Sequence, residues 1–241
     1  MKAFLLAAGL GTRLRPLTNE IPKCLIKVCG KPLLEWWIKL FERYGIREVL
    51  INLHHLPDQV KFFVESYNTN VKFTFFYEEK LLGSAGTLIV NKDFIKNEKE
   101  FFIFYADNLT DYNLADFLKF HRAHNNDFSM ALFRTNDPKS KGIAILDKDK
   151  TIIEFEEKPE YPKSNLANAG IYISSPNILN ILPNNNDSEI LDIGFHLLPK
   201  LVGKMSGWET DGYLIDIGTH KDLKKAEEEW LQIINGGINE L

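Results

Sequence analysis

The sequence predicts an α/β fold in which a mostly parallel central sheet is flanked by helices. From the N-terminus to about residue 135, short apolar runs alternate with amphipathic stretches. This alternation is typical of parallel strands joined by helices that cover both faces of a sheet. After about residue 135 the helical patterns shorten and a hairpin pattern appears, which predicts a smaller mixed β region.

The first half contains the long, regular elements. The clearest helix covers residues 32–44, where apolar residues recur at helical spacing between Pro32 and Gly45. The other predicted helices are 58–66, 114–124 and a short one after the loop 78–87; the predicted strands are 4–8, 48–53, 71–77, 101–105 and 128–133.

The second half contains shorter elements. Residues 143–146 and 152–156 flank the turn 147–150 and predict a hairpin. Further strands are expected at 168–173 and 213–216, short helices near 177–182 and 194–201, and a closing helix at 221–234. Because no Pro/Ser-rich linker interrupts the chain, we expect one Rossmann-like domain, 1–241, with halves 1–135 and 136–241.

Composition restricts the class of protein. Hydrophobic residues make up 44% of the 241 residues and charged residues 26%, as in ordinary globular proteins. The net charge of −4 argues against a general nucleic-acid or membrane-surface binder. No apolar run is long enough for a bilayer span, and two unpaired cysteines, Cys24 and Cys29, suit a reducing compartment, so we expect a cytoplasmic protein. The sequence leaves a homo-oligomer open.

A glycine-rich, basic loop follows the first predicted strand. Glycines bring backbone N–H groups close to an anion, while Arg and Lys add positive charge around the same cavity. These are the groups that a nucleoside triphosphate requires. The residues expected to bind the nucleotide here are Leu6, Ala7, Ala8, Gly9, Gly11, Thr12, Arg13 and Lys23.

Three interpretations of this loop compete. A dinucleotide fingerprint fails because Leu14 replaces its third glycine, and a Walker A loop at Gly30-Lys31 fails because Pro32 replaces its Ser/Thr. The pattern G-x-G-T-R-x-x-P-x-T-x-x-x-P-K is complete from Gly9 to Lys23. It resembles the signature of sugar-1-phosphate nucleotidyltransferases, and the chain is most similar in appearance to short mannose- or heptose-1-phosphate guanylyltransferases.

Two aspartates end apolar runs that lie far apart in the sequence. Asp107 follows FFIFYA and Asp216 follows YLI. Carboxyl ends of strands face the ligand crevice of α/β sheets, and two carboxylates with phosphate oxygens suit Mg²⁺. Both resemble the metal-holding G-D and D-I-G-T motifs of the family, although Ala106 stands where glycine is usual.

The resemblance also assigns a sugar site. Residues 155–159 look like the family's F-x-E-K-P element, which implies Glu157 on sugar hydroxyls and Lys158 on the sugar phosphate. Asn168 and Gly170 resemble the N-x-G element beside the sugar, and Gly142 matches a backbone contact. From composition alone, residues 155–159 are also consistent with a solvated charge run, and 168–170 with the start of a strand.

The loop at residues 82–87 resembles the family's L-G-T-A-G loop over the base, with Ser84 in place of Thr and Gly83 as a nucleotide contact. Glu78 precedes it. A carboxylate there can accept two hydrogen bonds from guanine, whereas uracil and thymine offer one donor. This pattern favours guanine as the base. The alternative interpretation is that Glu78 and Glu79 are surface residues at the end of a strand and do not contact a base.

Together these motifs imply a Mg²⁺-dependent enzyme that binds a nucleoside triphosphate and a sugar 1-phosphate. The expected catalytic residues are Arg13 on the leaving pyrophosphate, Lys23 on the α-phosphate, Lys158 on the attacking phosphate, and Asp107 and Asp216 on the metal. GTP with a manno-configured hexose or heptose 1-phosphate is the first expectation. The alternatives are dTTP or UTP with a sugar 1-phosphate, CTP with a non-sugar phosphate, and, more distantly, a non-catalytic nucleotide-sugar-binding regulatory subunit.

Overall fold

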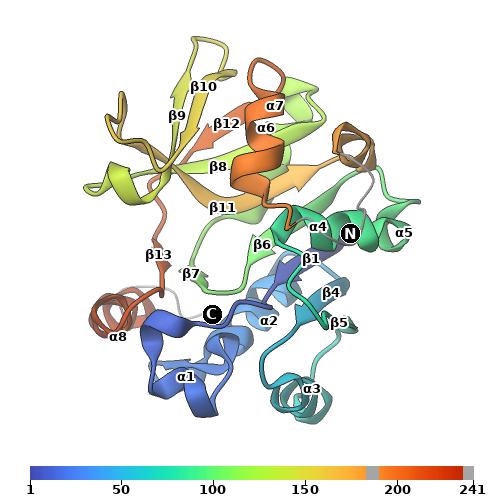
Figure 1. Cartoon of the computed structure of the whole chain (residues 1–241), viewed down its shortest axis with the longest axis vertical. Helices are drawn as coiled ribbons and strands as arrows, with labels where there is room; N and C mark the ends of the chain where they lie inside the picture. Colours follow the sequence, from blue (N-terminus) through green and yellow to red (C-terminus); the bar gives the residue numbers. More distant parts are fainter. Residues whose placement is uncertain (183–189, 236–241) are drawn as a thin grey trace.

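One mixed sheet forms the centre of the molecule in the computed structural model, which describes residues 1–182 and 190–235 (Figure 1). In this part of the chain it has nine strands: the path β10-β9-β11-β6-β1-β4-β5, with β8 beside β11 and β12 beside β8. The strands are β1 (Lys2–Leu6), β4 (Glu48–Leu53), β5 (Lys72–Tyr77), β6 (Phe101–Tyr105), β8 (Phe128–Arg134), β9 (Gly142–Leu146), β10 (Ile152–Glu157), β11 (Leu166–Ser174) and β12 (Ser206–Glu209).

Two short antiparallel ribbons accompany this sheet. They are β2 (Lys27–Val28) with β3 (Lys31–Pro32), and β7 (Asn108–Thr110) with β13 (Leu214–Asp216). The helices are α1 (Leu17–Glu20), α2 (Leu33–Arg43), α3 (Pro57–Ser66), α4 (Ser84–Val90), α5 (Lys92–Ile95), α6 (Leu114–His124), α7 (Leu198–Leu201) and α8 (His220–Asn235). Shorter turns are η1 (Thr12–Leu14), η2 (Lys23–Leu25), η3 (Pro138–Ser140), η4 (Pro176–Ile181) and the π-helical η5 (Ile193–Leu197).

The sheet has a parallel part and a mixed part, and β8, which the sequence analysis assigned to the first, parallel half, lies in the mixed part because it pairs with β11 and β12. Strands β6, β1, β4 and β5 are parallel neighbours, whereas β11 runs antiparallel to both β6 and β8. Strands β8 to β12 occupy the upper part of Figure 1, away from α2 and α3. The predicted α/β fold with a mostly parallel sheet and a smaller mixed region is therefore confirmed.

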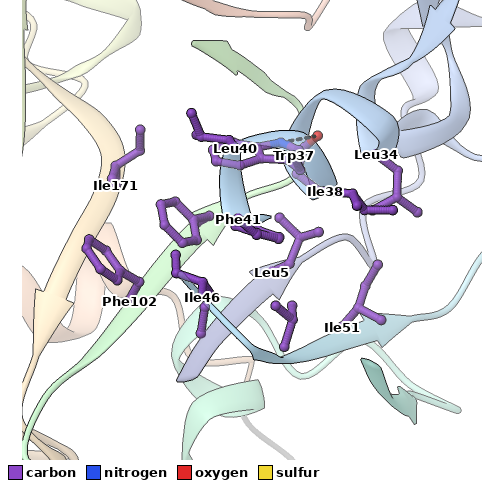
Figure 2. Close-up of a cluster of buried hydrophobic side chains, with 14 of the residues drawn as sticks. Leu5, Leu34, Trp37, Ile38, Leu40, Phe41, Ile46, Ile51, Phe102 and Ile171 are labelled. Carbon is purple, nitrogen blue, oxygen red and sulfur yellow. Dashed lines mark hydrogen bonds between the residues drawn. The ribbon is translucent and has the colours of Figure 1, made fainter. Parts of the chain in front are cut away.

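Alternating side chains of the buried strands build two cores, one on each face of the sheet. On β1, Ala3 and Leu5 point to one face, while Phe4 and Leu6 point to the other. Figure 2 shows the first core, where Trp37 and Phe41 of α2 pack over Leu5. The second core lies under α4, α5, η5 and α7. Burial on both faces explains why these strands are apolar runs without alternation.

A third apolar cluster joins the two ends of the chain. Leu14 and Trp36 from the N-terminal part pack with Ile217 and with Trp230 of α8. The rings of Trp36 and Trp230 lie 5.5 Å apart at 79°. In addition, His220 Nε2 lies 3.1 Å from the carbonyl oxygen of Arg15. The C-terminal helix thus packs against the segment that carries the basic loop.

The structure corrects some predicted boundaries. The first strand ends at Leu6 and not at residue 8, because the N–H of Ala7 donates to the side chain of Asn52 (2.7 Å) and leaves the sheet. The predicted helix at 194–201 starts as the π-helical turn η5, and the one near 177–182 is the 3₁₀ turn η4. Strands β7 and β12 were not predicted. Over residues 1–182 and 190–235, no helix combines the length and apolar character needed to cross a membrane.

Candidate functional site

Two adjacent cavities open at the carboxyl ends of the parallel strands. The larger, of about 340 Å³, lies at the ends of β1, β4 and β6. The smaller, of about 260 Å³, lies among β9, β10, β11 and η5. Tyr105, Asp107 and Asp192 line both cavities, so the two are neighbours that meet at the end of β6. We call them the strand-end cavity and the hairpin cavity.

The strand-end cavity collects most of the predicted nucleotide contacts. It is lined by Leu6, Ala7, Ala8, Gly9, Lys23, Glu78, Gly83 and Asp107, as well as by unpredicted residues such as Asn52 and Ser84. Gly11, Thr12 and Arg13 do not line it. They lie on the adjoining loop, where the guanidinium of Arg13 lies over Gly218 and would be 3.0 Å from a Cβ at that position. This places Arg13 beside the D-I-G-T segment that follows β13.

Hydrogen bonds and close packing fix the conformation of the basic loop. Gly11 has a φ of 60°, and its carbonyl oxygen accepts a hydrogen bond from Thr18 Oγ1 (2.8 Å). A Cβ on Gly11 would come within 2.9 Å of Thr18 Cγ2, so glycine is required there for both space and φ. The carbonyl oxygen of Thr18 in turn lies 2.7 Å from His55 Nε2. The loop conformation is therefore fixed from both sides.

The two predicted metal-binding aspartates meet around one lysine. Lys23 Nζ forms an ion pair with Asp107 Oδ2 and lies 3.8 Å from Asp216 Oδ1. Strand β7 continues from Asp107 and pairs with β13, which ends at Asp216, so this ribbon carries residue 216 to the end of β6. The pairing brings together carboxylates that are more than one hundred residues apart.

The donor set at this point fits Mg²⁺. Asp216 Oδ1 is buried and accepts no hydrogen bond from the residues that the structure describes, which leaves an oxygen suited to a metal. Within residues 1–182 and 190–235, no group of three or more His, Cys, Asp and Glu could hold a metal. Two carboxylates with substrate phosphate oxygens and water are the coordination that Mg²⁺ favours. Asp107 and Asp216 are therefore the residues that would hold it.

Glu78 has a different environment from the one predicted. It is 2% exposed, which corrects the surface alternative. Its Oε1 accepts from Asn52 Nδ2 (2.8 Å) and from Thr87 Oγ1, and its Oε2 accepts from the N–H of Leu82 (3.0 Å). Because these three donors occupy the carboxylate, the two-bond contact with guanine does not fit this structure. Glu78 instead joins the ends of β4 and β5 to α4.

The hairpin cavity contains every residue predicted for the sugar site: Gly142, Glu157, Lys158, Asn168 and Gly170. Burial raises the pKa of Glu157 above its usual value, Lys158 and Lys141 oppose this, and Asp192 adds to it. Asn168 donates to Tyr172 Oη (2.8 Å) and accepts from the N–H of Gly170 (2.9 Å), so both ends of its amide are engaged within β11.

Glycines let the backbone approach Glu157 closely. A Cβ on Gly142 would lie 2.5 Å from Glu157 Oε2, and one on Gly194 would lie 2.7 Å from it. Gly170 has a φ of 67°, and its Cβ would lie 2.7 Å from the ring of Tyr105. The cavity wall therefore has no room for larger residues at these three positions.

Several lining residues were missed from the sequence. Asp192 accepts from Ser84 Oγ (2.8 Å) through one oxygen and from the N–H of Gly194 (2.8 Å) through the other. It thereby joins the first residue of α4 to η5, and it borders both cavities. Lys141 also lines the hairpin cavity, with Nζ 3.2 Å from Asp216 Oδ2. A lone Asp and a lone Lys in loops gave no motif by which to find them.

Comparison with known proteins identifies the family of this chain. The model of the nucleotidyl transferase family matches residues 2–233. The chain belongs to the nucleotidyl transferase family. Curated relatives include the mannose-1-phosphate guanylyltransferase catalytic subunit beta of Danio rerio, 30% identical over 97% of this chain and 66% of its own length. Mannose-1-phosphate guanyltransferase of Schizosaccharomyces pombe is also 30% identical, over 92% of this chain and 62% of its own. The chain thus spans slightly less than two thirds of these relatives.

Solved structures show the same nucleotidyl transferase fold. A Bacillus anthracis protein, provisionally assigned as a glucose-1-phosphate thymidylyltransferase, superimposes with a TM-score of 0.84 at 27% identity, covering 95% of this chain and 94% of its own. HddC from Yersinia pseudotuberculosis, complexed with GMP-PN, gives a TM-score of 0.78 at 25% identity over 95% and 99%.

Proposed function

We propose that this nucleotidyl transferase transfers a nucleotidyl group from a nucleoside triphosphate to a sugar 1-phosphate and releases pyrophosphate. One observation carries the proposal: Lys23 contacts both Asp107 and Asp216 where the two cavities meet. A cation between two carboxylates at this junction suits a metal-bound triphosphate in the strand-end cavity and a sugar phosphate in the hairpin cavity. The names of the relatives support the same reaction class.

The chemistry needs charge neutralisation more than proton transfer. An oxygen of the sugar phosphate forms a bond to the α-phosphorus, and the bond from that phosphorus to the oxygen that joins it to the β-phosphorus breaks. The electron pair leaves with pyrophosphate. No general base is required, because the second pKa of a phosphate monoester is about 6. The barrier is the repulsion between two anions, so alignment and positive charge accelerate the step.

The positions of the basic residues suit separate parts of this reaction. Lys23, at the junction, neutralises the α-phosphate as charge develops there. Arg13, on the loop beside Gly218, holds the departing pyrophosphate. Lys158, on the hairpin cavity, binds the attacking phosphate. Asp107 and Asp216 would hold Mg²⁺, which supplies charge stabilisation to the phosphate oxygens.

GTP with a manno-configured hexose or heptose 1-phosphate is the proposed substrate pair. It is supported by the two relatives named as mannose-1-phosphate guanylyl- or guanyltransferases and by the neighbour complexed with GMP-PN. The glutamate argument for guanine no longer contributes, because Glu78 is engaged internally. A thymidylyl- or uridylyltransferase is the second candidate, favoured by the Bacillus anthracis neighbour.

Pyrophosphate release from a matrix of substrates tests the proposal. GTP, dTTP, UTP and CTP are each combined with mannose 1-phosphate, glucose 1-phosphate, a manno-heptose 1-phosphate and phosphocholine, with Mg²⁺. We expect the highest rate for GTP with a manno-configured sugar 1-phosphate, and loss of turnover with EDTA. Turnover only of phosphocholine with CTP would establish a cytidylyltransferase for a non-sugar phosphate. Binding of nucleotide sugars without turnover of any pair would favour the regulatory subunit.

A further inference from the structure

Lys141 is a basic residue of the hairpin cavity that the proposed reaction has not yet used. It lies between η3 and β9, immediately before Gly142, and its side chain is 29% exposed. Its Nζ donates to Asp216 Oδ2 at 3.2 Å. A long, flexible side chain is therefore held by one ionic contact at the wall of a cavity.

Lys141 and Lys158 are adjacent in space. The N–H of Lys158 donates to the carbonyl oxygen of Lys141 (3.0 Å), directly after the pairing of Gly142 with Glu157 between β9 and β10. The positive charges of both lysines oppose the rise in the pKa of Glu157 that burial causes. Both ammonium groups therefore act on the same part of the hairpin cavity.

Asp216 lies between two lysines that face different cavities. Its Oδ1 is 3.8 Å from Lys23 Nζ, and its Oδ2 is 3.2 Å from Lys141 Nζ. Lys23 lines the strand-end cavity and Lys141 the hairpin cavity. A phosphate group beside Lys141 would thus lie next to a nucleotide phosphate beside Lys23, as attack on the α-phosphorus requires.

The known charges leave the attacking phosphate incompletely neutralised. Lys158 Nζ lies 6.0 Å from the ring centre of Phe195, and among residues 1–182 and 190–235 no carboxylate comes within 4.0 Å of it. It contributes a single positive charge to a phosphate that is close to a dianion at neutral pH. Glu157 and Asp192 add negative charge to the same cavity. A second cationic side chain in this cavity would balance more of that negative charge.

We propose that Lys141 is a second phosphate-binding residue for the sugar 1-phosphate, acting together with Lys158 and held in position by Asp216 until the substrate binds. The inference rests on the proposed function and adds to it the residue that completes the acceptor phosphate site. Asp216 then has two roles: its carboxylate orients Lys141, and it also lies beside Lys23.

A simpler role for Lys141 is to keep Asp216 in place. The two roles differ in what a variant loses. A phosphate-binding lysine affects the affinity for the sugar 1-phosphate, whereas a lysine that only holds Asp216 affects the requirement for Mg²⁺. The comparison uses Lys141→Met, which keeps the length and removes the charge, and Lys141→Arg, which keeps the charge. The matched control is Lys139→Met, an exposed lysine of η3 that lines neither cavity.

Steady-state kinetics with GTP and mannose 1-phosphate form the first arm. For Lys141→Met we expect KM for mannose 1-phosphate to rise roughly tenfold to a hundredfold, the usual effect of losing a charged hydrogen bond. KM for GTP and the Mg²⁺ dependence stay within about twofold, Lys141→Arg recovers most of the affinity, and Lys139→Met behaves as wild type. A rise confined to the Mg²⁺ requirement would overturn the proposal.

Equilibrium binding without Mg²⁺ forms the second arm and does not depend on turnover. Mannose 1-phosphate and inorganic phosphate are titrated separately into each protein after circular dichroism has confirmed folding. We expect both ligands to bind wild type and to bind Lys141→Met at least about tenfold more weakly. Equal affinity in the two proteins, or no binding to wild type, contradicts the role of Lys141. If wild type binds phosphate but turns over no substrate pair, the reaction is wrong while the site stands.

Discussion

The two cavities are built by opposite means. Backbone and apolar groups make up much of the strand-end cavity, and Asn52 and Glu78 on its wall form a hydrogen-bonded network with Thr87 and with the backbone N–H groups of Ala7 and Leu82. The hairpin cavity is walled by charged side chains, among them Glu157, whose pKa burial raises. The strand-end cavity therefore has its shape before a ligand binds, whereas the hairpin cavity contains charged groups whose charge a bound ligand would balance.

This difference indicates where specificity and affinity arise. A satisfied network is rigid, and losing one member leaves a buried group unpaired. A charged cavity instead accepts substitutions that keep its charge balance. Variants of the Asn52, Glu78 and Thr87 network should therefore affect stability and nucleotide binding together, whereas changes of charge in the hairpin cavity should alter sugar phosphate binding with little loss of stability. Four predictions test this contrast, from the largest expected effect to the smallest.

Lys23→Ala removes the cation at the junction of the cavities. We expect kcat to fall by about 10³-fold or more, because charge developing at the α-phosphate loses its partner. The fold should persist, as judged by circular dichroism. The control is Lys27→Ala, an exposed lysine of β2 close by in the sequence. Near-normal turnover of the Lys23 variant would refute the role given to this residue.

Thr87→Val removes one hydroxyl from the network. Glu78 Oε1 loses a donor and Asn52 Nδ2 loses an acceptor, so we expect a loss of about 1–3 kcal/mol in the free energy of unfolding. KM for the nucleotide should rise while KM for the sugar phosphate stays the same. Urea denaturation and kinetics measure both. Thr74→Val, on the exposed side of β5, is the control and should change neither.

Replacing one glycine of each cavity by alanine tests whether the space around that glycine determines the effect on stability. A Cβ on Gly142 would lie 2.6 Å from Cζ of the Phe155 ring and close to the carboxylate of Glu157, so Gly142→Ala should destabilise the protein by about 1–3 kcal/mol and weaken sugar phosphate binding. A Cβ on Gly9 would meet no atom of the described part of the chain within 4 Å, so Gly9→Ala should keep its stability and raise KM only for the nucleotide. Equal thermal midpoints for the two variants would contradict this.

Glu157→Gln should have the smallest effect on stability and a favourable one. Burial raises the native pKa of Glu157 above 4.5, so the native state holds its proton longer than the unfolded state does. The stability of wild type therefore falls as pH rises from 4.5 through the native pKa. The variant should have the higher thermal midpoint at pH 7 and lose this advantage near pH 4. Glu156→Gln, on the exposed neighbour, should show no such dependence. KM for the sugar phosphate should rise for Glu157→Gln and stay unchanged for Glu156→Gln.

The sequence predicted the long elements because their patterns are local. Helix α6 and strands β4 and β6 have the predicted limits, since apolar periodicity alone determines them. Strands β7 and β12 were missed because their signals are weak: Asn108–Thr110 has only three residues, and Ser206–Glu209 contains a glycine. Their formation depends on pairing with distant partners.

The candidate site follows the same division. Residues within the motif from Gly9 to Lys23, or at strand ends such as Asp107, could be predicted because spacing or position marks them. Asn52, Lys141 and Asp192 could not, since each has its role only through a partner far along the chain. Glu78 was placed at the right cavity with the wrong task, because sequence does not show that three internal donors occupy it.

The packing of α8 against the N-terminal segment has a consequence for biosynthesis. Trp230 covers Trp36, and His220 reaches the backbone of Arg15, so the basic loop gains part of its support from residues 220–235. A ribosome-bound chain lacks this helix until translation has passed that point. The loop that is made first is thus stabilised last, and a nascent chain should acquire its affinity for triphosphates only once α8 has emerged from the exit tunnel.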